Sequence, residues 1–122
     1  MVFIICPVRN ADAQTQHILA DYVQTLEEKG CQVHYPPRDT NQNDPIGNRI
    51  CEENFKAILQ ADEIHVFYDK NSTGVHFDFG GVFMLTQTLG YRKKIVFINK
   101  YEVVISKGKS FPRLLAFLED HS

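Results

Sequence analysis

The stretch EIHVFYDKNSTGVHFDFGGVFMLTQTL, residues 63–89, contains one complete unit of strand, turn and helix. An apolar run at Glu63–Tyr68 is followed by a polar turn at Asp69–Gly74 and by a longer, mostly apolar run at Val75–Leu89. A short apolar run bounded by Asn, Ser and Gly is typical of a buried strand, and the second run has the length of a helix. The segment therefore predicts a loop at the carboxyl end of a strand, leading directly into a helix.

The same alternation of strand and helix continues in both directions along the chain. Strands are predicted at Val2–Cys6, Cys31–Tyr35 and Lys94–Asn99, with a fifth candidate at Tyr101–Ile105. Helices are predicted at 12–29, 44–60 and 110–118, and a polar loop is predicted at 38–43. Gly30 ends the first of these helices, and Asp44, which is followed by Pro45, caps the second. Such alternation favours a parallel sheet covered on both faces. We expect one α/β domain over residues 1–122, a three-layer fold with a flavodoxin-like parallel sheet of 4–5 strands.

The composition narrows the classes of function. The chain has 122 residues, of which 43% are hydrophobic, and this is enough for one hydrophobic core. Its formal net charge of −2 argues against a protein that coats a nucleic-acid polymer. Its three cysteines form no C-x-x-C pair and predict a reducing, cytoplasmic environment without disulfides. No apolar stretch reaches the roughly 18–20 residues that span a membrane, and no ligand pattern predicts a metal or another cofactor.

The loops after the strands contain the candidate site residues, because ligands of such sheets bind beyond the carboxyl ends of the strands. In the loop at 69–74, Ser72 and Thr73 either cap the following helix or contact an anion, and Asp78 lies one turn beyond Gly74. The residues alone leave both interpretations open. Gly80 and Gly81 are unusual inside a helix and suggest the close approach of a strand, a subunit or a ligand.

The run from Ser72 to Gly80 resembles the Ser-x-Gly-x-x-x-Glu-x-Gly signature of the nucleoside 2-deoxyribosyltransferase superfamily, in the form found in 2′-deoxynucleoside 5′-phosphate N-hydrolases. Ala61-Asp62 before the strand, and Arg9 after the opening strand, extend the resemblance. It implies that Asp78 is the catalytic nucleophile, attacking the anomeric carbon of a deoxyribosyl group. It also implies a small-molecule nucleoside or nucleotide as partner, and a homodimer. The expected substrate-binding residues are Ser72, Thr73, Gly74, Arg9, Pro7, Asn54, Asp69 and His76.

Three positions depart from the family pattern and leave two functions open. Asp78 replaces the glutamate, Asn54 replaces a second carboxylate, and Phe3 replaces a tyrosine. One hypothesis is an enzyme that processes N-glycosidic bonds as a deoxyribosyltransferase or a deoxynucleotide N-hydrolase. The other is a catalytically impaired member that binds a nucleotide-like ligand as a sensor or interaction module. A response-regulator-like signalling domain ranks last, because the acidic cluster that would follow the first strand is missing.

Overall fold

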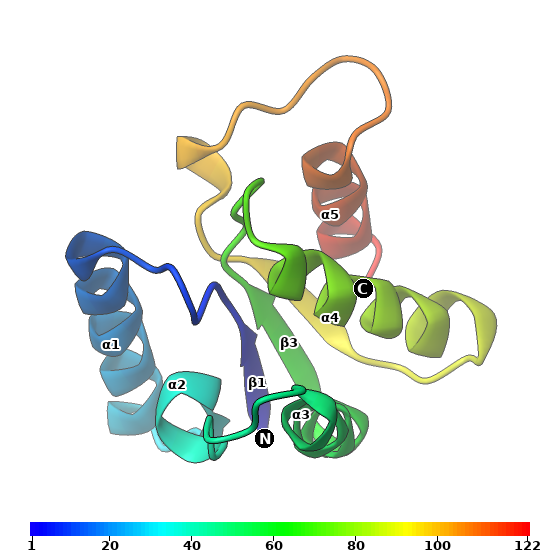
Figure 1. The fold of residues 1–122 in the computed structure, drawn as a ribbon. Coiled ribbons are helices and arrows are strands. Elements are labelled where there is room, and N and C mark those ends of the chain that lie inside the picture. Colours follow the sequence, from blue (N-terminus) through cyan, green and yellow to red (C-terminus); the bar gives the residue numbers. More distant parts are fainter.

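The computed structural model describes residues 1–122 and has a four-stranded sheet at its centre (Figure 1). The strands are β1 (Val2–Ile5), β2 (Val33–His34), β3 (Glu63–Val66) and β4 (Lys94–Phe97). All neighbouring strands run parallel, in the order β2-β1-β3-β4, and the register pairs Phe3 with Ile64 and Ile64 with Ile95. The expected α/β class, parallel sheet and single three-layer domain are confirmed.

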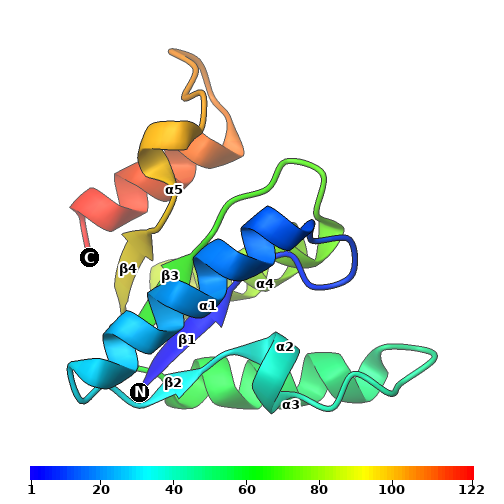
Figure 2. The same ribbon diagram turned by 90° about the vertical axis from the view of Figure 1, so that its left-hand side faces the viewer.

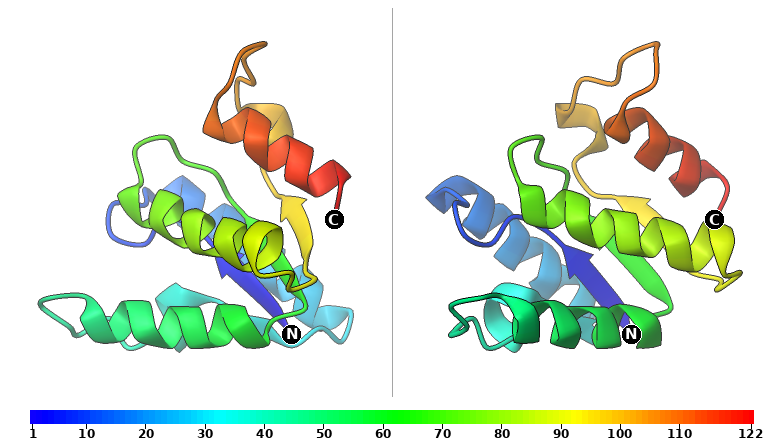
Figure 3. Two further views of the ribbon diagram at one scale, coloured as in Figure 1. Left: turned by 90° about the vertical axis from the view of Figure 1, so that its right-hand side faces the viewer. Right: turned by 45° about the vertical axis from the view of Figure 1, so that its right-hand side comes forward.

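Five α-helices accompany the sheet: α1 (Ala13–Glu28), α2 (Pro36–Asp39), α3 (Asn48–Gln60), α4 (Thr73–Phe83) and α5 (Phe111–Asp120). A π-helical turn, Met84–Thr88, extends α4, and a 3-10 turn, Lys100–Glu102, follows β4. Helix α1 covers one face of the sheet (Figure 2), whereas α3, α4 and α5 lie on the other (Figure 3). None of these helices has the length and apolar character needed to cross a membrane.

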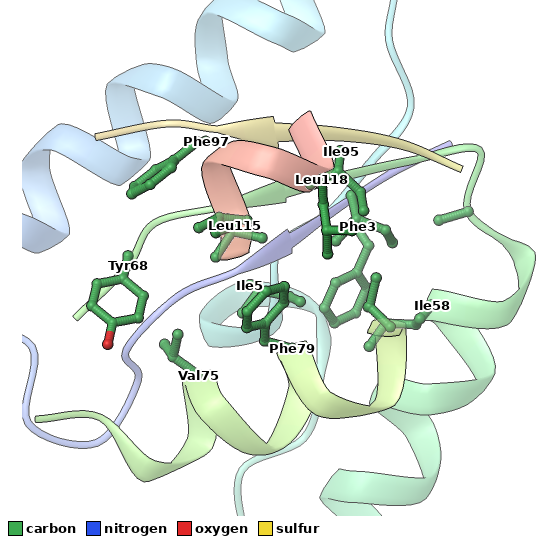
Figure 4. Close-up of a cluster of buried hydrophobic side chains, with 14 of the residues drawn as sticks. Phe3, Ile5, Ile58, Tyr68, Val75, Phe79, Ile95, Phe97, Leu115 and Leu118 are labelled. Carbon is green, nitrogen blue, oxygen red and sulfur yellow. The ribbon is translucent and has the colours of Figure 1, made fainter. Parts of the chain in front are cut away.

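The larger core lies between the sheet and the three helices α3, α4 and α5 (Figure 4). Phe3 and Ile5 of β1 point into it, because alternate residues of a strand face the same side. Val75, Phe79 and Val82 supply the inner stripe of α4 at helical spacing. This packing fixes the position of α4 and therefore the direction of every side chain on it.

Helix α1 begins and ends where the sequence predicts. Asp12 is the N-cap, and its carboxylate accepts a hydrogen bond from the Thr15 amide at 2.7 Å. Gly30 follows the helix with φ of 89°, a left-handed conformation that glycine adopts without steric cost. On the face of the sheet that α1 covers, the buried His65 ring lies between the hydroxyl of Tyr22, a residue of α1 (2.6 Å), and the Glu63 carboxylate (3.0 Å). Both ring nitrogens of His65 therefore have hydrogen-bond partners within the protein.

The expected fifth strand at Tyr101–Ile105 is wrong. The segment forms a 3-10 turn and loop, in which Tyr101 is 95% exposed and Val104 is 90% exposed. The outer edge of β4 has other partners, because the amide of Phe97 donates to the Glu119 carboxylate at 2.7 Å and the amide of Ile95 donates to the Ser122 hydroxyl at 2.9 Å. These edge amides are therefore satisfied by the end of α5 instead of by another strand.

Two expected boundaries around α2 and α3 also need correction. Residues 36–39 of the segment between β2 and α3 form the short helix α2 instead of a loop, because Pro36 has the backbone angle that suits the first turn of a helix. Helix α3 begins at Asn48, after Gly47 with φ of 86°, and not at Pro45. Asp44 still caps it from a distance, since its carboxylate accepts from the amides of Arg49 and Ile50 at 2.8 and 3.1 Å.

Candidate functional site

The turn between β3 and α4 is held in shape by its own polar side chains. The Asp69 carboxylate accepts a hydrogen bond from the Asn71 amide at 2.9 Å, and the Asp69 carbonyl accepts from the Ser72 amide at 3.0 Å. Ser72 is the N-cap of α4, and its Oγ accepts from the Val75 amide at 3.2 Å. Thr73 and Gly74 occupy the exposed first turn, where helix N–H groups lack partners within the helix. The capping role predicted for Ser72 is confirmed, and anion binding here stays a prediction.

His76 lies beside this turn with both ring nitrogens occupied. Its Nδ1 is 2.7 Å from the Ser72 carbonyl and must therefore donate a proton, so that Nε2 accepts from the Tyr68 hydroxyl at 2.8 Å in the neutral ring. The ring also meets Phe111 of α5 edge to face, at 5.2 Å between centroids. His76 thus joins the turn to the start of α5, and its contact with a substrate stays a prediction.

Asp78 lies one turn further along α4, partly buried and without any hydrogen bond or ion pair within the chain. Burial raises the pKa of its carboxyl to about 7. Its charge reaches the thiols of Cys6, at the end of β1, and of Cys51, on α3, and helps burial to raise the pKa of both. Asp78 therefore lies where β1, α3 and α4 meet. The absence of any compensating partner distinguishes it from the other carboxylates near the turn.

Asn54 is committed to a chain of hydrogen bonds within the protein. The Thr40 hydroxyl donates to its Oδ1 at 2.8 Å and, having used its proton, accepts from His34 Nε2 at 2.8 Å. The His34 ring stacks on Phe3, with centroids 5.2 Å apart. Asn54 is buried on α3, so the chain of bonds ties α3 to the segment after β2. Its oxygen already has one partner, and binding of a base by this residue stays a prediction.

A hollow of about 600 Å³ lies beyond the carboxyl ends of β1 and β2, against the first half of α1. Its wall includes Pro7, which is buried, together with Val8, Tyr35, Pro37 and Gln42. Arg9, in the same loop as Pro7, is exposed. Burial is the main cause that raises the pKa of Tyr35, and the Cys6 thiol raises it further. The Cys6 thiol is therefore near Tyr35, a lining residue of this hollow, as well as near Asp78.

The structure thus divides the predicted site residues into three groups. Ser72, Thr73, Gly74, Asp69 and His76 surround the start of α4, with Asp78 one turn beyond, whereas Pro7 and Arg9 lie on the loop after β1 and Asn54 lies in α3. Gln42 is a lining residue that the sequence analysis did not single out. The only signal for it was its place in the polar loop after the second strand.

In comparisons with known proteins, no family model, no curated protein and no solved structure matches this chain. The fold establishes the class: a single-domain α/β protein with a four-stranded parallel sheet and polar loops at the carboxyl ends of its strands. No group of three or more His, Cys, Asp or Glu side chains is arranged to hold a metal ion. The chemistry available at the start of α4 is a carboxyl group that gains or loses its proton near neutral pH, next to a helix N-terminus.

Proposed function

We propose that the protein processes the N-glycosidic bond of a nucleoside or nucleotide, with Asp78 as the nucleophile. The observation that carries the proposal is the position of this carboxyl, partly buried and unpaired one turn inside α4, at the carboxyl end of the sheet. Carboxyl groups whose pKa is strongly perturbed by burial are concentrated at functional sites. The resemblance of residues 72–80 to the deoxyribosyltransferase signature supplies the reaction class.

The reaction would proceed in two displacements. An Asp78 carboxylate oxygen forms a bond to the anomeric carbon while the bond from that carbon to the base nitrogen breaks, and the base leaves with the bonding electron pair and takes a proton from water. Water, or a second base, then attacks the same carbon and releases the carboxylate. In this proposal the free amides at the start of α4, together with Ser72 and Arg9, hold a 5′-phosphate or a 5′-hydroxyl, as the resemblance implies.

Because only the ionised carboxyl can attack, the rate should follow the deprotonation of Asp78. Its raised pKa predicts that base release increases from pH 5, reaches half of its maximum near pH 7 and levels off only above about pH 8. The test is chromatography of free base after incubation with deoxynucleosides and their 5′-monophosphates, for the unmodified protein and for Asp78→Asn and Asp78→Ala. Asp120→Asn, at an exposed position of α5, is the matched control. Base release that persists in both Asp78 variants would show that Asp78 is not the nucleophile.

Asp78→Glu tests whether the length of the side chain limits the reaction. Glutamate restores the reach that the family signature implies, because one methylene extends a carboxylate by roughly 1–1.5 Å. A displacement of about 1 Å can change a rate on the order of 100-fold. We expect Asp78→Glu to raise base release, and an unchanged or lower rate would show that the backbone already places the shorter aspartate.

The second candidate function is binding without turnover. The observation that favours it is the commitment of Asn54 to Thr40, together with the complete burial of Phe3, since neither residue can transfer a proton to a departing base. In that case the same nucleotides should raise the melting temperature of the protein without release of base. Release of base that is lost in Asp78→Asn would exclude this alternative.

A further inference from the structure

The segment that joins β4 to α5 projects away from the sheet and the helices in each view of the molecule (Figures 1, 2 and 3). Its first half presents aliphatic side chains to solvent, because Val104 is 90% exposed and Ile105 is 37% exposed. Phe111, where the segment enters α5, is 56% exposed. These side chains remain accessible because a projecting loop has no neighbouring element to bury them.

Three basic side chains gather on the second half of the same segment. Lys107 and Lys109 lie on either side of Gly108, so their Cα atoms are at most about 7 Å apart. The Arg113 guanidinium reaches back and donates a hydrogen bond to the Ser106 carbonyl at 3.4 Å, which brings a third positive charge to this turn. All three basic side chains are exposed, and none of them forms an ion pair. We call residues 103–113 the basic loop.

The positive charge of the basic loop is not compensated by its neighbours in the sequence. Between Glu102 and Glu119 the chain contains no acidic residue, and Glu119 is already bound to Lys100 at 3.1 Å. The whole chain nevertheless has a net charge of −2, so the remainder of the molecule carries an excess of acidic residues. Such a separation of charge turns the basic side of a molecule toward a negatively charged surface. The basic loop therefore favours a partner with many negative charges.

We propose that the basic loop binds the surface of a bilayer that contains anionic lipids. Lys107, Lys109 and Arg113 contact the charged headgroups. Val104 and Ile105 enter the boundary between the headgroups and the acyl chains. These two aliphatic residues favour a bilayer over other polyanions, because aliphatic side chains do not stack on the bases of a single-stranded nucleic acid. An acidic peptide would need a groove or a strand edge, which a projecting loop does not offer.

Co-sedimentation with lipid vesicles tests the proposal directly. The probes are vesicles of phosphatidylcholine alone and vesicles in which phosphatidylserine replaces about 30% of that lipid. Each basic residue near an anionic membrane strengthens binding about fivefold, so three of them should favour the mixed vesicles on the order of 100-fold in about 0.1 M salt. Most of this preference should disappear in about 0.5 M salt, where the charges are screened. Equal binding to both kinds of vesicle, or binding to neither, would overturn the proposal.

A pair of double variants tests whether the basic loop supplies the contact. Lys107→Gln combined with Lys109→Gln should lower the partition coefficient for the mixed vesicles about 30-fold. Lys29→Gln combined with Lys56→Gln is the matched control, since it removes the same two charges from exposed positions on other elements and should change the coefficient about twofold at most. Equal losses in the two double variants would overturn the proposal, because net charge and not the basic loop would then determine binding.

Val104→Ser separates insertion into the bilayer from attraction between charges. The position is 90% exposed, so the variant should fold, and we expect its partition coefficient to fall on the order of tenfold. Ile46→Ser, at another 90% exposed position, is the matched control and should have little effect. Unchanged binding of Val104→Ser, or tighter binding of a single-stranded oligonucleotide than of the mixed vesicles, would overturn the proposal. These measurements involve no nucleoside, so failure of membrane binding and failure of the proposed function remain distinguishable.

Discussion

Replacing Asp78 by asparagine should stabilise the protein at neutral pH and have little effect in acid. The carboxyl has its pKa raised by burial from 3.8 to about 7, so the folded state holds the proton more tightly than the unfolded chain does. The stability that comes from the protonated form is complete below about pH 4. It is lost as the pH rises through about 7, where the partly buried group must ionise without a partner.

The magnitude follows from the size of the shift. About three pKa units, at 1.36 kcal/mol each, correspond to about 4 kcal/mol lost between pH 4 and pH 8. Partial contact with water reduces this loss, so we expect roughly 2–4 kcal/mol. Asparagine has nearly the same shape and does not titrate, and the variant should therefore exceed the unmodified protein by this amount at pH 8. Near pH 4 the two proteins should differ little.

The assay is urea unfolding followed by circular dichroism at pH 4, 5.5, 7 and 8, at one protein concentration. The Cys6 and Cys51 thiols, whose pKa the Asp78 charge helps to raise, titrate above pH 8, so between pH 4 and pH 8 the difference between the two unfolding free energies isolates Asp78. Asp120→Asn, on the exposed side of α5, should show no such trend. A difference that stays flat from pH 4 to pH 8 would refute the reasoning, because it would mean that solvent or a partner already stabilises the Asp78 carboxylate.

Two further substitutions test the packing around the site. Gly81→Ala should lower the free energy of unfolding by about 1–3 kcal/mol, because the new methyl group forces the Phe55 ring aside, whereas Gly108→Ala, which meets no atom within 4 Å, should have little effect in the same urea titration. Glu119→Ala should cost about 1–3 kcal/mol and promote aggregation on light scattering, because it leaves the edge amide of Phe97 without its acceptor. Glu119→Gln keeps an acceptor oxygen and should behave much more like the unmodified protein, and equal losses in both variants would contradict the role assigned to this bond.

The elements whose signals are local could be predicted from the sequence. Asp12 and Gly30 mark the two ends of α1, and their positions are confirmed by the observed cap and the left-handed glycine. The length of the apolar run at Val75–Leu89 likewise predicted a helix, and α4 with its π-helical turn covers Thr73–Thr88. Such residues act within one turn of themselves, so their effect can be worked out without knowledge of the rest of the chain.

The expected strand at Tyr101–Ile105 failed for a reason outside that segment. Its residues have high β propensity, but a strand also needs a free edge with which to pair. Glu119 and Ser122 already bind the edge amides of β4, and they come from the last turn of α5 and from the residues just after it, which follow the segment in sequence. Local propensity contains no information about such a competitor.

The candidate site shows the same division. Capping was one of two interpretations that the sequence left open for Ser72, and the structure shows the cap. The cost of glycine predicted a close approach near Gly81 by a strand, a subunit or a ligand, whereas the neighbour is Phe55 of another helix, α3. The unpaired state of Asp78 depends on the meeting of three elements that are distant in sequence. No pattern in the sequence measures how much water reaches that carboxyl, although its chemistry depends on this.

The hydrogen bonds from the end of α5 to the edge strand β4 prevent a further strand from adding to this edge of the sheet. While the helix stays docked, a foreign strand approaching β4 meets a carboxylate and a hydroxyl where it would need vacant backbone donors. At the opposite border, β2 is only two residues long and offers a very short template. Growth of the sheet into fibrils is therefore obstructed at both borders, and any ordered assembly of intact molecules is left to the surfaces of the helices.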